Sequence, residues 1–339
     1  MSFAKNAFYS AVQLLPLRML QNKHAGGLLL PYEHLVSDKD VPHIKHLYPF
    51  KGIQAFIQDL DYLLKHFKPV TLQDVISSLK SGQALPARSF LLTFDDGLRE
   101  VTETIAPLLI KKGIPAAFFL NSAFIDNKTL YYKFKVSLMV ESLKTGNHST
   151  ATLSKLAEIM GASGKDALID AIKAISYNNK ELADTAGIIL GLSFEDFLRE
   201  QRPFMTLDEI ATLVKQGFAI GGHSVDHPYY HQLTLEEQLA QTRESVNFLT
   251  ERFNLSYRAF AFPHTDEGIS SAFFENILNN KDSLDVIFGT ANHKRDISPR
   301  ILHRFNCERP AIPVYAAVKG ILLLNRLDKI RNKEVITRY

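Results

Sequence analysis

The sequence of 339 residues predicts an α/β fold built on a parallel sheet. Apolar runs of strand length alternate along the chain with helical patterns. One strand–helix–strand unit is complete, with a strand over 90–94, a helix over 102–112 that stops at Gly113, and a strand over 116–120. Three further helices begin with a capping box, a threonine followed three residues later by an acid, at Thr71, Thr206 and Thr234. In such sheets the functional residues follow the carboxyl ends of the strands.

The remaining elements continue this alternation, except in one long stretch. Further strands are expected over 27–32, 218–220, 257–264, 285–290 and 299–305, and further helices over 53–67 and 314–329. The length fits one large barrel-like domain or two ordinary ones, and we expect a single domain over 1–339. Between 126 and 202 every periodic segment is helical, which predicts a helical insertion within that domain. An insertion of this length either shapes substrate access or provides an interaction surface.

Composition indicates a soluble globular protein, with 46% hydrophobic and 22% charged residues. The formal net charge of +3 is not concentrated in a basic stripe, so we expect no nucleic-acid partner. Cys307 is the single cysteine and therefore excludes an intrachain disulfide framework. One unpaired cysteine fits a reducing compartment, and we expect a cytoplasmic location.

The first 25 residues contain polar residues where a secretory signal has an unbroken apolar core, so no signal peptide is expected. No run of 18 apolar residues occurs anywhere, which argues against a spanning helix. Apolar residues at helical spacing, accompanied by Arg18 and Lys23, nevertheless indicate an amphipathic helix: Phe8, Val12, Leu15 and Leu20. This helix either lies on a membrane surface as a peripheral contact or packs on its own domain.

An apolar run over 89–94 ends in two adjacent acids, Asp95 and Asp96, followed by Gly97. Because the backbone turns where a strand ends, both carboxylates can reach one cavity. Two carboxylates in an apolar setting require a nearby cation or a shared proton. The alternative is an ordinary turn, for which this composition is also typical.

A second strand runs through paired glycines into His223 and His227, which are separated by four residues. One helical turn brings residues at this spacing onto the same side. One carboxylate and two imidazoles form a metal site with open positions for water and substrate. The alternative is that the two histidines lie at the solvent-exposed start of a helix. At the end of the 27–32 strand, Glu33 and His34 either face the same cavity or belong to an ordinary loop.

The segments 93–97 and 223–227 resemble the first two motifs of the polysaccharide deacetylases, the NodB-homology or carbohydrate esterase family 4 group. The resemblance spans about 28–304 apart from the insertion, and it implies a distorted (β/α) barrel of about seven strands. It also implies that Asp95 is the general base and that Asp96, His223 and His227 bind the metal. Zn²⁺ is the usual ion of the family, and another divalent transition metal suits the same donors.

The third family motif is only partly kept. Ala261 occupies the position of an arginine and His264 that of a tyrosine, so a backbone N–H near His264 is the candidate oxyanion donor. Arg304 resembles an arginine that a helix-inserted subgroup carries on its last strand. We expect it to keep Asp95 ionised, with a surface salt bridge as the alternative.

The general acid has two candidates. His303 loosely matches a Leu-x-His motif on the last strand of relatives, and His264 competes with it. Strand alternation directs His303 and Arg304 to opposite faces, so they are not expected to act together.

These observations together predict a metal-dependent carbohydrate deacetylase, a hydrolase whose partner is an acetylated carbohydrate. The first choice of substrate is an N-acetyl sugar or polysaccharide and the second an O-acetyl ester. Two alternatives stay open: a deformylase of a formamido sugar, and a metal-containing carbohydrate-binding protein without turnover. Asp95 favours an enzyme, because a binding protein has no need of an unligated acid beside the metal.

Overall fold

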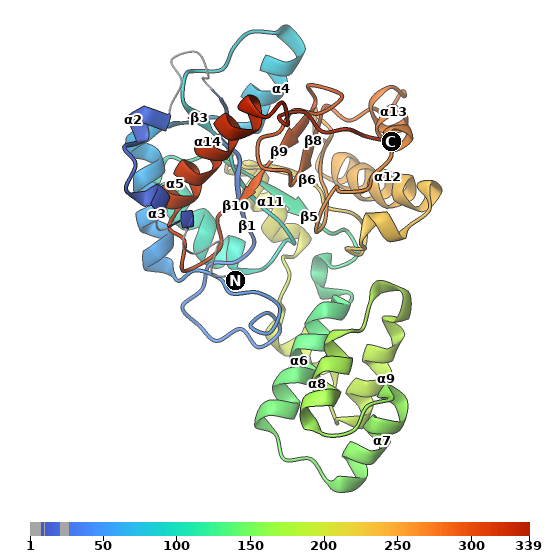
Figure 1. Ribbon diagram of the computed structural model, residues 1–339. Coiled ribbons are helices and arrows are strands. Elements are labelled where there is room, and N and C mark those ends of the chain that lie inside the picture. The colour runs from blue at the N-terminus through green and yellow to red at the C-terminus, as the bar shows by residue number, and fades with distance from the viewer. Residues whose placement is uncertain (1–7, 10, 21–26) are drawn as a thin grey trace.

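The computed structural model describes residues 8–9, 11–20 and 27–339 and has the α/β architecture that the sequence predicts (Figure 1). Within this part of the chain, eight parallel strands form one sheet in the order β10-β1-β4-β5-β6-β7-β8-β9. Their bounds are β1 Pro31–Glu33, β4 Leu92–Phe94, β5 Ala116–Leu120, β6 Ala219–Gly222, β7 Ala259–Ala261, β8 Val286–Gly289, β9 Ile301–His303 and β10 Phe305–Asn306. The expected distorted (β/α) barrel is confirmed.

The two edges of this sheet are halves of one strand that is interrupted at Arg304. Leu302 in β9 pairs with Phe288 in β8, whereas Phe305 in β10 pairs with Pro31 in β1. The sheet therefore nearly closes at Arg304, and the eight strand segments occupy about seven positions around the barrel. This interruption places Arg304 where strands from both ends of the chain meet.

Helices cover the outside of the barrel, as the alternation predicts (Figure 1). They are α3 Ile53–His66, α4 Leu72–Ser81, α5 Ala106–Lys112, α11 Leu207–Lys215, α12 Leu235–Arg252, α13 Ser271–Leu278 and α14 Val314–Ile330. A π-helical turn over Val101–Ile105 precedes α5, and a two-stranded sheet joins β2 Lys68–Pro69 to β3 Ser89–Phe90. The capping boxes at Thr71, Thr206 and Thr234 all form. Helix α13 was not expected from the sequence.

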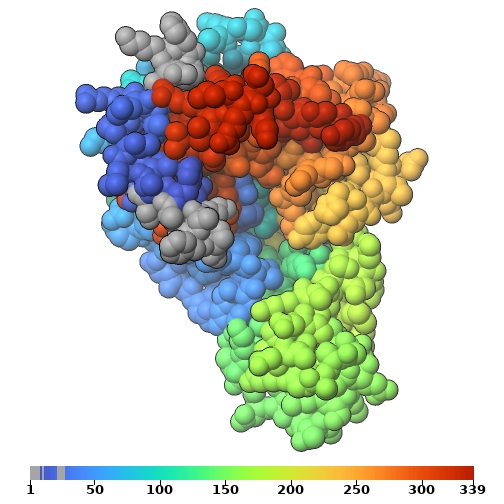
Figure 2. Space-filling model, in the orientation of Figure 1, coloured from blue at the N-terminus to red at the C-terminus, as the bar shows by residue number. Residues whose placement is uncertain are grey.

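The insertion over residues 126–202 forms helices α6–α10 and no strand, in a stretch that the structure describes throughout. Their bounds are α6 Tyr132–Thr145, α7 Thr150–Met160, α8 Lys165–Lys173, α9 Glu181–Ile189 and α10 Phe194–Gln201. In Figures 1 and 2 these green segments form a lobe that projects from the barrel. The apolar side chains of the lobe, among them Phe134 and Met139, form one core with Leu35, Val41 and Leu98 of the barrel part of the chain.

The amino-terminal segment packs on the barrel helices. Val12 and Leu20 are buried, and Gln13 accepts hydrogen bonds from Tyr315 and Lys319 of α14. Helix α2 covers only Leu17–Leu20, and Lys23 lies outside the described residues. These contacts agree with the expectation of a segment packed on its own domain. Within the described part of the chain, no helix has the length and apolarity that crossing a bilayer requires.

The carboxyl-terminal residues pack against the barrel, where the charged side chain of Arg338 is buried. Arg338 donates to both Asp266 and Asp296, and Asp296 also lies 2.9 Å from Nε2 of His303. These four side chains are all nearly or completely buried. Asp266 in turn accepts a hydrogen bond from the backbone of Thr290. The cluster therefore joins the end of the chain to the loops after β7 and β8.

We expect Arg338→Ala to reduce the free energy of unfolding by about 3–5 kcal/mol, because two buried carboxylates lose their shared cation. Urea denaturation followed by circular dichroism measures this change. Arg295→Ala is the matched control, since its exposed ion pair with Glu334 is worth at most about 1 kcal/mol. Equal stabilities of the two variants would contradict the structural role of Arg338.

Candidate metal centre and active site

Asp95 and Asp96 lie at the end of β4, where the backbone turns. The backbone N–H of Asp95 still donates to Glu33, but Asp96 and Gly97 both have positive φ, at 72° and 69°. A Cβ on Gly97 would lie 3.2 Å from Leu120, so glycine fits this turn for steric and conformational reasons. Both carboxylates are consequently buried and line one cavity, as the sequence predicts.

His223 and His227 follow β6, but no helical turn connects them. The expectation of a helical spacing was wrong, because the chain forms a loop in which Ser224 and His227 have positive φ. This loop is held by Asn121, which donates to the carbonyl of His223 and to the hydroxyl of Ser224. The Ser224 hydroxyl then accepts the N–H of His227, and this brings the two imidazoles within 5.0 Å, ring centre to ring centre.

Asp96, His223 and His227 offer three ligand atoms that all lie within 4.8 Å of one another. Oδ1 of Asp96 is 3.1 Å from Nε2 of His227 and 3.5 Å from Nε2 of His223. Both Asp96 Oδ1 and His223 Nε2 are buried, yet they form no hydrogen bond with any described residue. Buried polar atoms without partners are costly, so this arrangement fits a divalent cation.

The other nitrogen of each imidazole is occupied, which sets the orientation of the ring. Nδ1 of His223 donates to the carbonyl of Ala261 at 2.8 Å. Nδ1 of His227 lies 3.1 Å from the hydroxyl of Tyr131, at the start of the insertion. Contacts of this kind select the tautomer that leaves Nε2 free to bind a metal.

Arg304 forms a buried bidentate ion pair with Asp95, with N–O distances of 2.7 and 2.8 Å. Burial alone would raise the pKa of Asp95, but the guanidinium of Arg304, together with His223 and His34, lowers the pKa below the usual value. Arg304 also donates to Thr93 and lies over the ring of Tyr32. The alternative of a surface salt bridge is excluded, because Arg304 has no exposed area.

His34 lines the same cavity and is held by Glu308. Nδ1 of His34 is 2.8 Å from one Glu308 oxygen, while the other oxygen accepts the backbone N–H groups of His34 and Leu35. Burial favours the neutral imidazole, but Glu308, together with Asp96 and Asp95, overcomes this effect and raises the pKa of His34 to about 10. Glu33, by contrast, lies outside the cavity wall and faces Lys51 at 3.6 Å.

His264 forms part of the cavity wall beside the metal ligands. Its ring stacks on Tyr229 with 3.6 Å between the ring centres, and it lies 4.4 Å from the ring of His227. The Tyr131 hydroxyl is 3.3 Å from Nε2 of His264, so Tyr131 bridges the two imidazoles. Burial is the main reason why the pKa of His264 lies well below its usual value.

His303 does not line this cavity. Alternation along the last strand separates it from Arg304, as expected, and directs it into the cluster with Asp266, Asp296 and Arg338. Its two ring nitrogens lie at hydrogen-bond distance from Asp296 and from the backbone N–H of Ala291. His303 therefore has no ring nitrogen free for a substrate.

Two residues of the site received no role from the sequence, Tyr131 and Glu308. Glu308 had a detectable signal, because Arg304, Asn306 and Glu308 alternate along the segment that contains β10 and contribute to one side of the barrel. No comparable pattern marks Tyr131, which contacts His227 from 96 positions away.

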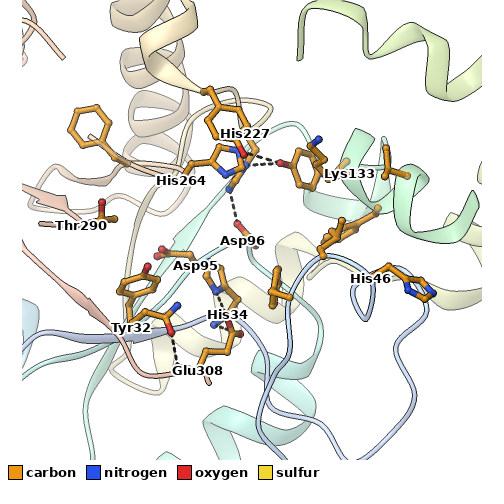
Figure 3. Close-up of a pocket in the computed structure, with 18 of the residues that line it drawn as sticks. Tyr32, His34, His46, Asp95, Asp96, Lys133, His227, His264, Thr290 and Glu308 are labelled. Atoms are coloured by element: carbon orange, nitrogen blue, oxygen red, sulfur yellow. Dashed lines mark hydrogen bonds and ion pairs between the residues drawn. The ribbon is translucent and has the colours of Figure 1, made fainter. Parts of the chain in front are cut away.

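Together these residues surround a cavity of about 460 Å³, which Figure 3 shows from one side. Asp95 and Asp96 lie at its centre, with Tyr32 and Thr290 on one side and Lys133 on the other (Figure 3). A volume of this size is typical of sites for small molecules or for part of a polymer. The cavity thus combines a candidate metal centre, an ionised carboxylate and a charged imidazole.

Comparisons with known proteins agree with this geometry. The family model described as polysaccharide deacetylase matches residues 82–273, which is more than half of the chain. No curated protein sequence matches the chain.

Similar solved structures include the Streptococcus pyogenes deacetylase PplD in complex with acetate, with 12% identity and a TM-score of 0.54. IcaB from Ammonifex degensii has 18% identity and a TM-score of 0.53, and each of these two alignments covers 87% of this chain and 97% of the other. A de-N-acetylase from Aggregatibacter actinomycetemcomitans has 13% identity and a TM-score of 0.54, with coverage of 87% and 99%. At such identities the likeness concerns the fold alone.

Proposed function

The chain belongs to the polysaccharide deacetylase family, and from this premise we propose that it is a metal-dependent hydrolase. Its reaction would remove acetyl groups from an N-acetylated sugar or polysaccharide with water as the nucleophile. The observation that carries the proposal is the convergence of two unpartnered buried ligand atoms, on Asp96 and His223, beside the ionised Asp95.

Asp96, His223 and His227 are the residues that would hold the metal. One carboxylate and two imidazoles suit Zn²⁺ or another divalent transition metal. When bound there, such an ion supplies Lewis-acid activation of water and of the acyl oxygen. The contacts of His223 with Ala261 and of His227 with Tyr131 keep both Nε2 atoms directed at this position.

Asp95 is the proposed general base, which takes the proton of the attacking water. Its ion pair with Arg304 keeps the carboxylate ionised and fixes its direction. Asp95 lies 3.9 Å from Nε2 of His223, close to the metal site without joining the ligand set. Arg304 therefore acts through Asp95 as a positioning residue.

His34 is the proposed general acid, which protonates the leaving amine as the tetrahedral intermediate breaks down. Glu308 holds Nδ1, so Nε2 is the ring nitrogen left for the substrate. His264 is less suited to this role, because no described carboxylate pairs with it and its ring is stacked on Tyr229 and meets His227 edge-on. A charged donor supports an N-acetyl substrate, since an amine leaves only after protonation whereas an alkoxide is a better leaving group.

Metal dependence is tested by acetate release from a panel of N- and O-acetylated oligosaccharides. We expect a chelator to abolish acetate release from the parent protein and added Zn²⁺ to restore it. We also expect His223→Ala to lose most of its bound metal, measured by elemental analysis, because the remaining ligands cannot complete the site.

Asn276→Ala, on the exposed side of α13, is the control and should bind as much metal as the parent. Metal content in His223→Ala equal to that of the control would contradict the ligand set. Formate release instead of acetate release would favour the deformylase, and tight binding of acetylated sugar without either product would favour the binding protein.

We expect Asp95→Asn to retain its metal and to lose about 10²–10⁴-fold in kcat, because an amide cannot accept the proton of water. Steady-state acetate release measures the rate, and elemental analysis measures the metal. Thermal denaturation is recorded in parallel, since the variant leaves Arg304 without its anion. Parental activity in a folded, metal-loaded Asp95→Asn protein would rule out this base.

The pH dependence tests the general acid. His34 must be protonated to act, and Glu308 holds its pKa near 10, so the parent should keep its activity well above neutral pH. In Glu308→Gln the carboxylate is lost, the pKa of His34 falls, and the alkaline limb of kcat should move to lower pH. An alkaline limb that is identical in the parent and in Glu308→Gln would assign the acid to another group.

A further inference from the structure

The helical insertion contributes two lysines to the wall of the active-site cavity. Lys133 belongs to α6 and Lys173 to the end of α8. Both line the same cavity as Asp95 and Asp96. Neither lysine forms an ion pair with a carboxylate among the described residues, although each stands at the edge of a site for a polar substrate.

Lys133 is the more constrained of the two. It is partly buried, its Nζ donates to the carbonyl of Ile175 at 2.6 Å, and the same atom lies 5.1 Å from the ring centre of Tyr132. Burial lowers the pKa of Lys133, because the ammonium has lost part of its water without gaining an anion. A carbonyl and a ring face satisfy an ammonium only in part, since it has three donors and a full charge.

Two other lysines of the insertion have carboxylate partners. Lys135 pairs with Asp184, and Lys180 pairs with Asp226 of the loop after β6. Two acids of the cavity have cationic partners as well, because Arg304 pairs with Asp95 and His34 with Glu308, and the third, Asp96, faces His223 and His227.

Lys133 and Lys173 thus add positive charge to the cavity wall that no carboxylate of the described residues pairs with. Figure 3 shows Lys133 across Asp96 from Tyr32 and Thr290, so a saccharide that lies over Asp96 would reach it. Electrostatic complementarity favours a ligand with negative charge on this side.

We propose, on the basis of the proposed function, that the substrate is an anionic acetylated saccharide whose carboxylate or phosphate binds Lys133 and Lys173. The insertion would then select the substrate by charge, while the barrel carries the acid, the base and the metal ligands. A uronic acid residue and a sugar phosphate both supply the required anion, and the experiment below separates them.

The test compares three N-acetylated oligosaccharides of equal length: one neutral, one with a uronic acid residue, and one with a phosphate. We expect the metal-loaded parent to prefer at least one anionic substrate by about tenfold in kcat/KM, the effect of one charge-assisted hydrogen bond. Preference for the uronate identifies a carboxylate as the anion, and preference for the phosphorylated sugar identifies a phosphate.

In Lys133→Gln and in Lys173→Gln, the ratio of kcat/KM for the preferred anionic substrate to that for the neutral one should fall by about tenfold. The loss should come mainly from KM, because the charge binds the substrate away from the reacting atoms. Lys135→Gln is the matched control, since Lys135 lies on the same helix and pairs with the exposed Asp184. The control should keep the parental ratio.

Binding gives a second measurement that is independent of turnover. The deacetylated anionic oligosaccharide is titrated into the parent and each lysine variant by calorimetry, and we expect weaker binding in Lys133→Gln and Lys173→Gln than in Lys135→Gln. Equal ratios and equal affinities in all proteins would overturn the proposal, as would a parent that prefers the neutral substrate. In those cases metal-dependent acetate release would still support the deacetylase. Absence of acetate release from every substrate would instead reject the proposed function itself.

Discussion

Two adjacent carboxylates buried at the end of β4 are the constraint on which the rest of the site depends. Both can remain ionised only where positive charge compensates each of them. For Asp95 this charge is the guanidinium of Arg304, at the point where β9 gives way to β10 and the barrel nearly closes. For Asp96 it would come from a cation at the position that Asp96 Oδ1 shares with the Nε2 atoms of His223 and His227. The strand interruption at Arg304 that nearly closes the barrel therefore also gives Asp95 a different partner, and so a different role, from Asp96.

The imidazoles of this protein illustrate how a partner decides the chemistry of one side chain. His34 is paired with a buried carboxylate and is held in the charged form, which suits a proton donor. His223 donates to a backbone carbonyl through Nδ1 and directs Nε2 at Asp96. His303 is enclosed by Asp296, Asp266 and Arg338 and has become part of the internal structure. The residue type is the same in each case, and the difference lies in the charge of its neighbours.

The insertion and the barrel meet at Tyr131, immediately before α6. Its hydroxyl contacts His227 and His264, so the orientation of a candidate metal ligand depends on where the insertion begins. Lys133 follows two residues later and lines the same cavity. The sequence identifies the insertion only as helical. In the structure, the hydroxyl of Tyr131 connects it to the candidate metal ligand His227. The insertion also places the positive charge of Lys133 in the cavity wall that a substrate would contact.

Much of the architecture was accessible from the sequence alone, because it depends on local patterns. The capping boxes, the helical character of 126–202 and the acids after β4 all follow from residues within a few positions of one another. Tertiary structure alone decided that a loop, rather than a helical turn, joins His223 to His227, and that Glu308 meets His34 from 274 positions away. It also decided that Arg304 faces Asp95 while His303 joins the buried cluster with Asp296, although strand alternation already required the two to separate. Local patterns record which conformation a segment prefers, whereas the charge state of a buried side chain depends on groups that only the closed barrel brings together.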